Sequence, residues 1–181
     1  MLSNAQVWPF YPADKQGGAV TGAVRFRDLP GSSDFDGAGL PWFRASDRGD
    51  LYPGGWPQGI RTNLVGGRYR RPVEAPVFDG LTPSDSDGNA AITWTGAGLP
   101  GGVLVQALNL DADNHPLMLA PNPAALALKI DTKTGLFRGK FTHPATHHAS
   151  KVRGAMLQKQ NLGAGAFRTD TEIGGVSIES K

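Results

Sequence analysis

Apolar and polar residues alternate with a period of two in almost every readable segment of this chain, and glycine recurs inside the same segments. In residues 135–141, Phe137, Gly139 and Phe141 fall on one face, and the charged side chains fall on the other. This is the period of an antiparallel strand with one buried face. A glycine weakens a flat strand, so Gly139 indicates a bend or a close approach of neighbouring backbones. The pattern predicts curved sheets with the uncharged faces inside.

The same alternation runs through both halves of the chain, with turn signals between the segments. The turn at 131–135 ends in Gly135, which suits the left-handed position of a type I turn with a bulge. We therefore predict an all-β fold, a mostly antiparallel barrel of about nine to eleven strands, with a curved β-sandwich as the alternative. The predicted strands are 17–28, 39–46, 59–70, 89–96, 101–110, 122–130, 136–141, 151–160, 164–168 and 174–180.

The length of 181 residues suits one core-forming domain. We predict an N-terminal extension over 1–16 and a single β domain over 17–181. Segment 18–24 aligns with 135–141, and each precedes a loop that contains proline. Two interpretations stay open: a duplication with half-units over about 17–82 and 88–180, or a chance match between glycine-rich strands.

Composition excludes several classes of protein. The chain has no cysteine, which excludes a disulfide scaffold, a thiol nucleophile and a thiolate zinc site. The formal net charge is only +2, so bulk charge gives no argument for nucleic acid. No stretch approaches the roughly 20 apolar residues of a membrane-spanning helix. We expect a chain that does not span a membrane, and any export signal would have been removed from it.

Several glycine and aromatic motifs resemble a known kind of segment. The chain reads G-L-F-R-G-K-F, then R-G-A-M-L-Q-K-Q-N-L-G-A-G-A-F and G-G-V-S-I; upstream stand Y-P-G-G-W-P-Q-G-I, V-G-G-R-Y-R-R-P and P-V-F-D-G-L. Together these motifs resemble the carboxy-terminal segment of large exported proteins of Verrucomicrobia and Planctomycetes, over roughly residues 17 to 180. Ala166 departs from the aromatic that is common there. The resemblance implies a β-module in an extracellular, cell-surface or periplasmic setting, and it implies no catalytic residues.

Sites for metals and catalysis have weak signals. His143, His147 and His148 share one loop, but no Asp or Glu lies between Asp131 and Asp170, so we interpret the loop as solvated rather than metal-binding. The acidic stretches 111–114 and 84–89 do not match a calcium loop, and they also suit ordinary turns. No nucleophile elbow, zinc-protease motif or phosphate loop is present. We predict no catalytic residues, no metal and no cofactor.

Binding has a stronger signal in the first half of the chain. Aromatic rings stack on sugars, and arginine forks grip carboxylate or sulfate. A neighbouring loop over 52–57 would have to bring Trp56 to the arginine side of the predicted strand 59–70, because Tyr69 alternates there with the arginines. Core packing of the same aromatics is the alternative interpretation. The candidate ligand-binding residues are Trp42, Trp56, Tyr69, Arg68, Arg70 and Arg71.

Two classes of function remain. The first is a non-catalytic β-module of a secreted or cell-surface protein, with a structural or interaction role. The second is a carbohydrate or small-ligand binding domain that prefers anionic ligands. A glycan or a protein is the expected partner, nucleic acid is not expected, and the sequence does not fix the oligomeric state.

Overall fold

A computed structural model describes residues 6–10, 18–46 and 51–181. The chain divides into two compact units, unit 1 over Met1–Arg68 and unit 2 over Tyr69–Lys181. This boundary lies upstream of the one predicted between the half-units. That residues 17–181 fold as a single domain stays a prediction.

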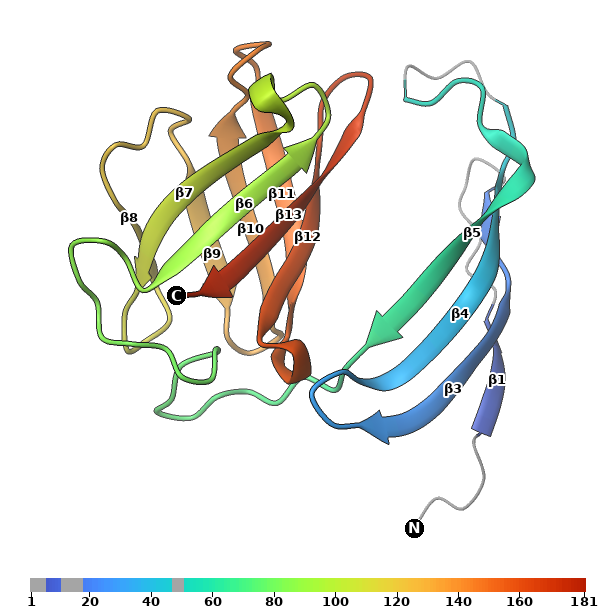
Figure 1. Cartoon of the computed structure of the whole chain (residues 1–181), viewed down its shortest axis with the longest axis horizontal. Coiled ribbons are helices and arrows are strands. Elements are labelled where there is room, and N and C mark those ends of the chain that lie inside the picture. Colours follow the sequence, from blue (N-terminus) through green and yellow to red (C-terminus); the bar gives the residue numbers. More distant parts are fainter. Residues whose placement is uncertain (1–5, 11–17, 47–50) are drawn as a thin grey trace. The chain divides into compact units, whose positions relative to one another are not determined.

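Unit 1 is one antiparallel sheet of five strands (Figure 1). β4 lies at its centre; β3 and the short β2 pair along one edge of β4, β5 pairs along the other, and β1 pairs with β3. Part of the predicted N-terminal extension is therefore a strand. The strands are β1 (Gln6–Phe10), β2 (Ala19–Val20), β3 (Gly22–Leu29), β4 (Ser33–Arg44) and β5 (Trp56–Gly66).

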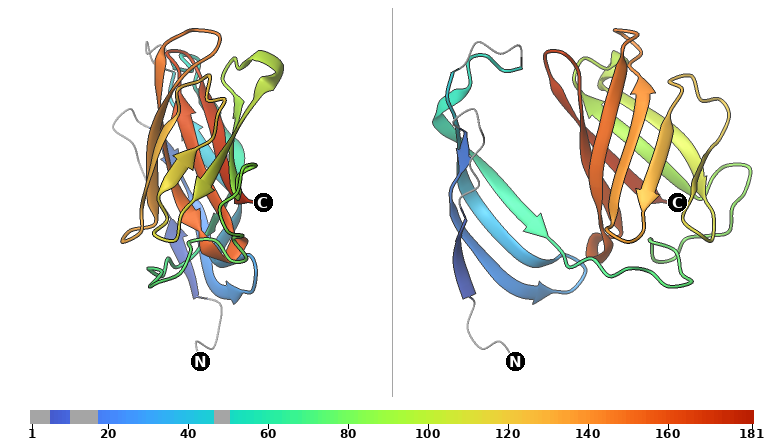
Figure 2. Two further views of the ribbon diagram at one scale, coloured as in Figure 1. Left: turned by 90° about the vertical axis from the view of Figure 1, so that its left-hand side faces the viewer. Right: turned by 180° about the vertical axis from the view of Figure 1, so that it is seen from behind.

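Unit 2 is one antiparallel sheet of eight strands that curls into a nearly closed barrel (Figures 1 and 2). Its order is β8-β7-β6-β13-β12-β11-β10-β9, so all but one pair of neighbours are consecutive in sequence. The strands are β6 (Ala90–Gly96), β7 (Val103–Leu110), β8 (Pro116–Met118), β9 (Ala127–Asp131), β10 (Leu136–Thr142), β11 (Ala149–Leu157), β12 (Leu162–Arg168) and β13 (Ile173–Ser180).

The predicted fold class is confirmed: the protein is all-β and antiparallel, with 54% strand and 4% helix. The barrel-shaped sheet contains eight strands, fewer than the nine to eleven predicted, because the first five strands form a sheet of their own. Among the described residues, the structure contains no helix that is long and apolar enough to cross a membrane.

The hydrophobic core lies inside the barrel of unit 2. In β10, Phe137 and Phe141 are buried while Arg138 and Lys140 are exposed, as the alternation predicts. Trp94 of β6 is fully buried against Phe141, with ring centroids 5.1 Å apart. The largest fully buried apolar side chains are Trp94, Phe78, Phe137, Phe141, Phe167, Ile92, Leu108, Leu110, Ile178 and Val152.

Glycines inside the barrel allow backbones and rings to approach closely. Gly154 of β11 lies directly opposite Phe137 of β10. A Cβ at Gly154 would overlap the Phe137 ring and the carbonyl oxygen of Ala164 on the next strand. A Cβ at Gly139 would lie 2.6 Å from the carbonyl oxygen of Ala127. Both residues therefore stand where backbones or rings crowd, as the sequence predicts.

Several predicted boundaries shift for local reasons. The predicted strand 122–130 is a strand only from Ala127 onward, because the Asn122 side chain closes a turn by hydrogen bonds to both backbone groups of Leu126. The predicted strand 151–160 ends at Leu157, and the predicted strand 164–168 begins earlier, at Leu162, because a short 3-10 helix over Gln158–Gln160 and the left-handed Asn161 reverse the chain between them. Gly135 has φ +71°, as the predicted turn requires.

Replacing Gly154 with Val should lower the free energy of unfolding of unit 2 by about 1–3 kcal/mol. The new side chain must displace a packed ring and a backbone oxygen, although valine itself favours strands. Ala166→Val is the control, because Ala166 is exposed on the neighbouring β12. Thermal unfolding followed by circular dichroism measures both variants, and equal melting temperatures for Gly154→Val and the wild type would contradict the packing role.

Candidate functional site

The aromatic and arginine residues predicted to form one ligand site are divided between the two units. Unit 1 holds Trp42 on β4, Trp56 at the start of β5, and Arg68. Unit 2 holds Tyr69, Arg70 and Arg71. The structure therefore brings together only parts of the predicted set within each unit.

Trp42 and Trp56 form the centre of an aromatic cluster in unit 1. Their ring centroids are 4.8 Å apart and their planes cross at 79°, and Tyr52 lies 5.9 Å from Trp56 at 65°. The Arg44 guanidinium lies over the Trp56 ring at 5.7 Å and donates to the carbonyl oxygen of Leu51. Because the rings meet edge to face, they pack on one another and do not form a coplanar platform for sugar rings.

Tyr69 belongs to the packing of unit 2. β5 ends at Gly66, so the prediction that a strand continues to residue 70, with Tyr69 and the arginines alternating across it, is wrong. The Tyr69 hydroxyl donates to the carbonyl oxygen of Thr132 at 2.9 Å, and its ring lies where a Cβ on Gly135 would be. Partial burial, followed by the nearby Asp131 charge, raises the pKa of Tyr69. The ring anchors the chain to the 131–135 turn.

His143 is a core residue, and its interpretation as part of a solvated loop is wrong. Its side chain is fully buried between Phe141 and Phe167. Nε2 lies 3.0 Å from the carbonyl oxygen of Ala97, while the N–H groups of Ala145 and Thr146 lie 3.3 and 3.4 Å from Nδ1. Nε2 therefore carries the proton and donates, and Nδ1 accepts. The ring closes the end of the barrel by binding two loops at once.

Replacing His143 with Ala should destabilise unit 2 by about 2–4 kcal/mol, because it leaves a cavity and an unpaired carbonyl group. His148→Ala is the control, since 74% of the His148 side chain is exposed and its Nδ1 lies 3.5 Å from a carboxylate oxygen of the exposed Asp170. Denaturant unfolding measures both. A loss for His148→Ala equal to that for His143→Ala would contradict the assigned role.

The acidic stretches act as turns. One carboxylate oxygen of Asp111 accepts the N–H groups of Asp113 and His115, both within 2.9 Å. Asp85 accepts the N–H of Asp87 in the same manner. Throughout the described part of the chain, His, Asp and Glu side chains form no group of three that could hold a metal ion.

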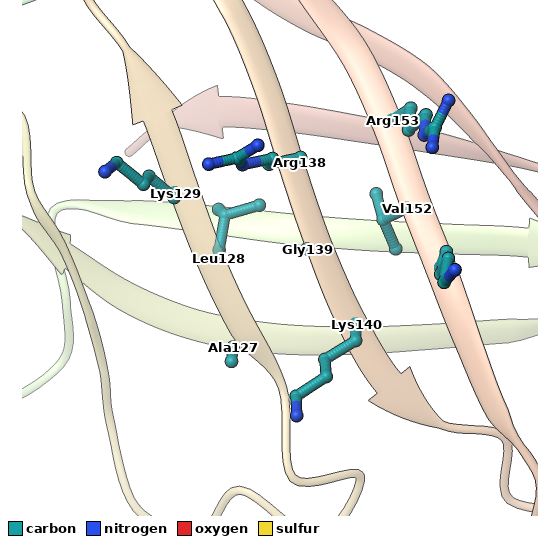
Figure 3. A pocket seen from close by; sticks show the side chains of 9 residues that line it. Ala127, Leu128, Lys129, Arg138, Gly139, Lys140, Val152 and Arg153 are labelled. Atoms are coloured by element: carbon teal, nitrogen blue, oxygen red, sulfur yellow. The ribbon is translucent and has the colours of Figure 1, made fainter.

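A concentration of positive charge lies on the outer surface of three neighbouring strands of unit 2. It consists of exposed side chains that alternate with the buried ones on β9, β10 and β11. Figure 3 shows several of them projecting around Gly139. We call this surface the cationic face; its residues are Lys129, Arg138, Lys140, Lys151 and Arg153.

Like charges stand directly opposite one another on the cationic face. Arg138 pairs in register with Lys129 on one side and with Arg153 on the other. Lys140 pairs with Lys151. None of the five forms an ion pair with a residue that the structure describes. Like charges in cross-strand pairs destabilise a sheet, so this arrangement carries a cost within the isolated unit.

Three shallow depressions adjoin on this surface, and Arg153 lines all of them. The central one has a volume of about 380 Å³ and its floor includes Gly139. The second extends to Lys133 and Asp131, and the third extends to Arg168 and Asp170. Cations therefore border an extended surface rather than an enclosed pocket, which suits a long ligand better than a small one.

Sequence reasoning found the members of the cationic face but not the face itself. Alternation places Arg138 and Lys140 outside on one strand and Arg153 outside on another. Only the register of β9, β10 and β11 shows that these residues are neighbours across strands. The sequence signal for the cationic face is the presence of outward-facing cations on consecutive strands that are joined as hairpins.

Asp131 is the carboxylate nearest to the cationic face along β9, and its side chain forms hydrogen bonds within the 131–135 turn. It accepts the N–H of Lys133 at 2.9 Å. This backbone hydrogen bond first, and then the Thr134 hydroxyl, lower the pKa of Asp131. Its charge therefore stabilises the 131–135 turn.

Replacing Asp131 with Asn should lower the melting temperature at pH 7, and the difference from the wild type should shrink as pH falls toward 2. The pKa in the folded protein is below the unfolded value of about 4, so the charge stabilises above that value and the contribution is lost as pH falls through the folded pKa. Thermal unfolding of both proteins from pH 7 to pH 2 measures the difference. A difference that persists unchanged at pH 2 would show that shape, not charge, matters at this turn.

No protein-family model, curated protein or solved structure matches the chain. The resemblance to exported-protein segments stays a prediction. A proposal about function therefore depends on the geometry of the two units.

Proposed function

We propose that this chain is a non-catalytic binding module and that the cationic face of unit 2 binds an anionic polysaccharide. The observation that carries the proposal is the set of cross-strand like-charge pairs, Arg138 with Lys129 and Arg153, and Lys140 with Lys151. Such pairs oppose folding in the free protein. A ligand that brings negative charge to these pairs removes the repulsion, so we expect affinity to rise with the charge density of the ligand.

The spacing of the cations suits a polymer with repeated acidic groups. Cross-strand neighbours lie about 5 Å apart, and alternate residues along a strand lie about 7 Å apart. Arg138 and Arg153 occupy adjacent strands, and their planar guanidinium groups match carboxylate or sulfate through two parallel hydrogen bonds. Lysines beside them add charge without fixed geometry.

The chemistry of the face favours a glycan over a single-stranded nucleic acid. No aromatic residue lines the central depression, so it offers no ring on which bases could stack. The proposed setting is extracellular or cell-surface, which the sequence resemblance supports and where acidic polysaccharides are encountered. In this proposal the barrel provides a rigid scaffold, and the bound polymer attaches the protein to its surroundings.

A direct test measures binding of a heparin octasaccharide by isothermal titration calorimetry at low salt. The variant Arg138→Ala, Lys151→Ala and Arg153→Ala should bind at least about tenfold more weakly, since one lost hydrogen bond to a charged group costs about 1.5–3 kcal/mol. The same variant should melt at the same temperature as the wild type or higher, because it removes repulsion. Wild-type affinity should fall as salt rises.

A second variant separates this surface from the aromatic site predicted from the sequence. Trp56→Ala with Arg68→Ala should leave octasaccharide affinity unchanged. Weaker binding by this variant, with unchanged binding by the cationic-face variant, would instead favour the aromatic and arginine site. No binding by the wild type, or tighter binding of an oligodeoxynucleotide of equal charge, would refute an anionic-glycan module.

A further inference from the structure

The sheet of unit 1 has one apolar face and one mixed face. Register places Phe26 opposite Phe35, with ring centroids 5.5 Å apart, and Trp42 opposite both Val20 and Ile60. The Leu40 side chain lies over Gly22 and Gly37, on this same side. We call this surface the apolar face; its residues are Val20, Val24, Phe26, Phe35, Leu40, Trp42, Ile60 and Leu64.

The opposite side of the sheet carries the charges. Arg27 and Asp36 form an ion pair there, and Arg61 donates to the carbonyl oxygen of Gly39. Val65 also lies on that side, since it pairs with Asp36. Most of the charge on the described strands is therefore on that side, as in a sheet that packs against a second layer. Arg44 is the exception: it follows Trp42 at the end of β4, and its guanidinium lies over the Trp56 ring beside Trp42.

The described residues of unit 1 form one sheet and provide no second layer. Val24 and Leu40 are its only buried hydrophobic side chains among the described residues. Phe26, Trp42 and Ile60 are 46%, 36% and 44% exposed, although all three lie within strands. Unit 2, in contrast, contains every residue of the buried core cluster. A contiguous exposed apolar surface of this kind marks an interaction site.

We propose that a second copy of this chain covers the apolar face, so that two unit 1 sheets pack face to face in a two-fold symmetric dimer. The face has no charged residue among its eight members, so it can meet its own copy without burying an unpaired charge. A two-fold axis that lies in the plane between the two sheets brings the same residues together from both copies. Face-to-face packing of twisted sheets at about 10 Å is a common solution for such surfaces.

The size of the face lies near the lower limit for a specific interface. Its residues come from β2, β3, β4 and β5, which contain 2, 8, 12 and 11 residues. At about 3.3 Å per residue along a strand and about 4.8 Å between strands, these four strands give a flat area of about 520 Å². Specific interfaces bury about 600 Å² or more per partner, so we expect a reversible dimer.

The experiment compares two substitutions on the same strand. Ile60 and Val65 of β5 are similarly exposed, 44% and 48%, but they lie on opposite faces. Analytical ultracentrifugation of the full chain should give a species of twice 19.1 kDa. Ile60→Asp should weaken dimerisation at least tenfold, and Val65→Asp should leave it unchanged. Circular dichroism confirms that each variant folds.

A second measurement does not depend on a disruptive substitution. The chain has no cysteine, so Ile60→Cys and Val65→Cys each introduce a single thiol. The thiol at position 60 should react with a disulfide reagent more slowly as protein concentration rises, whereas the thiol at position 65 should react at a constant rate. A wild type that stays monomeric at millimolar concentration, or a dimer in which position 60 is not protected, would overturn the proposal. Because these readouts concern unit 1 alone, their failure would leave glycan binding by unit 2 unaffected.

Discussion

The packing of an aromatic ring over a glycine on the neighbouring strand is the interaction on which the barrel of unit 2 depends. Phe137 faces Gly154, and Phe167 faces Gly174, in direct cross-strand register. Gly165 pairs with Gly154, so the Phe137 ring spans two strands that present no side chain. Large rings fit inside a small barrel only where the neighbouring strands have glycine, which leaves room for the ring. The inward positions fix the outward ones: with Phe137 and Gly154 inside, Arg138 and Arg153 must stand outside and side by side.

Unit 1 uses the same pairing but does not enclose it. Phe35 lies opposite Gly66, and a Cβ on that glycine would overlap the ring, as in the barrel. In unit 2 the sheet curls until its strands surround such rings, and burial of apolar surface then stabilises the fold. In unit 1 the sheet has five strands and leaves Phe26 and Trp42 partly exposed. The difference between the units thus lies in how many strands complete the layer, not in the local chemistry of the strands.

Local patterns predicted the inside and outside of single strands well, and they failed where distant segments meet. Alternation assigned Phe137 and Arg138 to the correct faces, and turn chemistry located Gly135. His143 was assigned to a solvated loop because its partner, the Ala97 carbonyl, is 46 residues away in sequence. The cationic face also escaped notice, since register between strands depends on the whole sheet. Alternation of Arg68, Tyr69 and Arg70 predicts a strand there, whereas the Gly66-Gly67 pair is the local signal that marks the end of β5.

The two proposed surfaces reinforce one another through valency. The cationic face belongs to unit 2 and the apolar face to unit 1, so a dimer formed through the apolar face uses no residue of the cationic face. Each dimer then carries two sets of five cations. A polysaccharide long enough to reach both converts the second binding event into an intramolecular one, which raises the overall affinity without any new contact. Each exposed cation binds an acidic group only weakly, because solvent and salt screen its charge. The dimer still binds the polymer tightly, since the polymer repeats its acidic groups and the dimer repeats the cationic face.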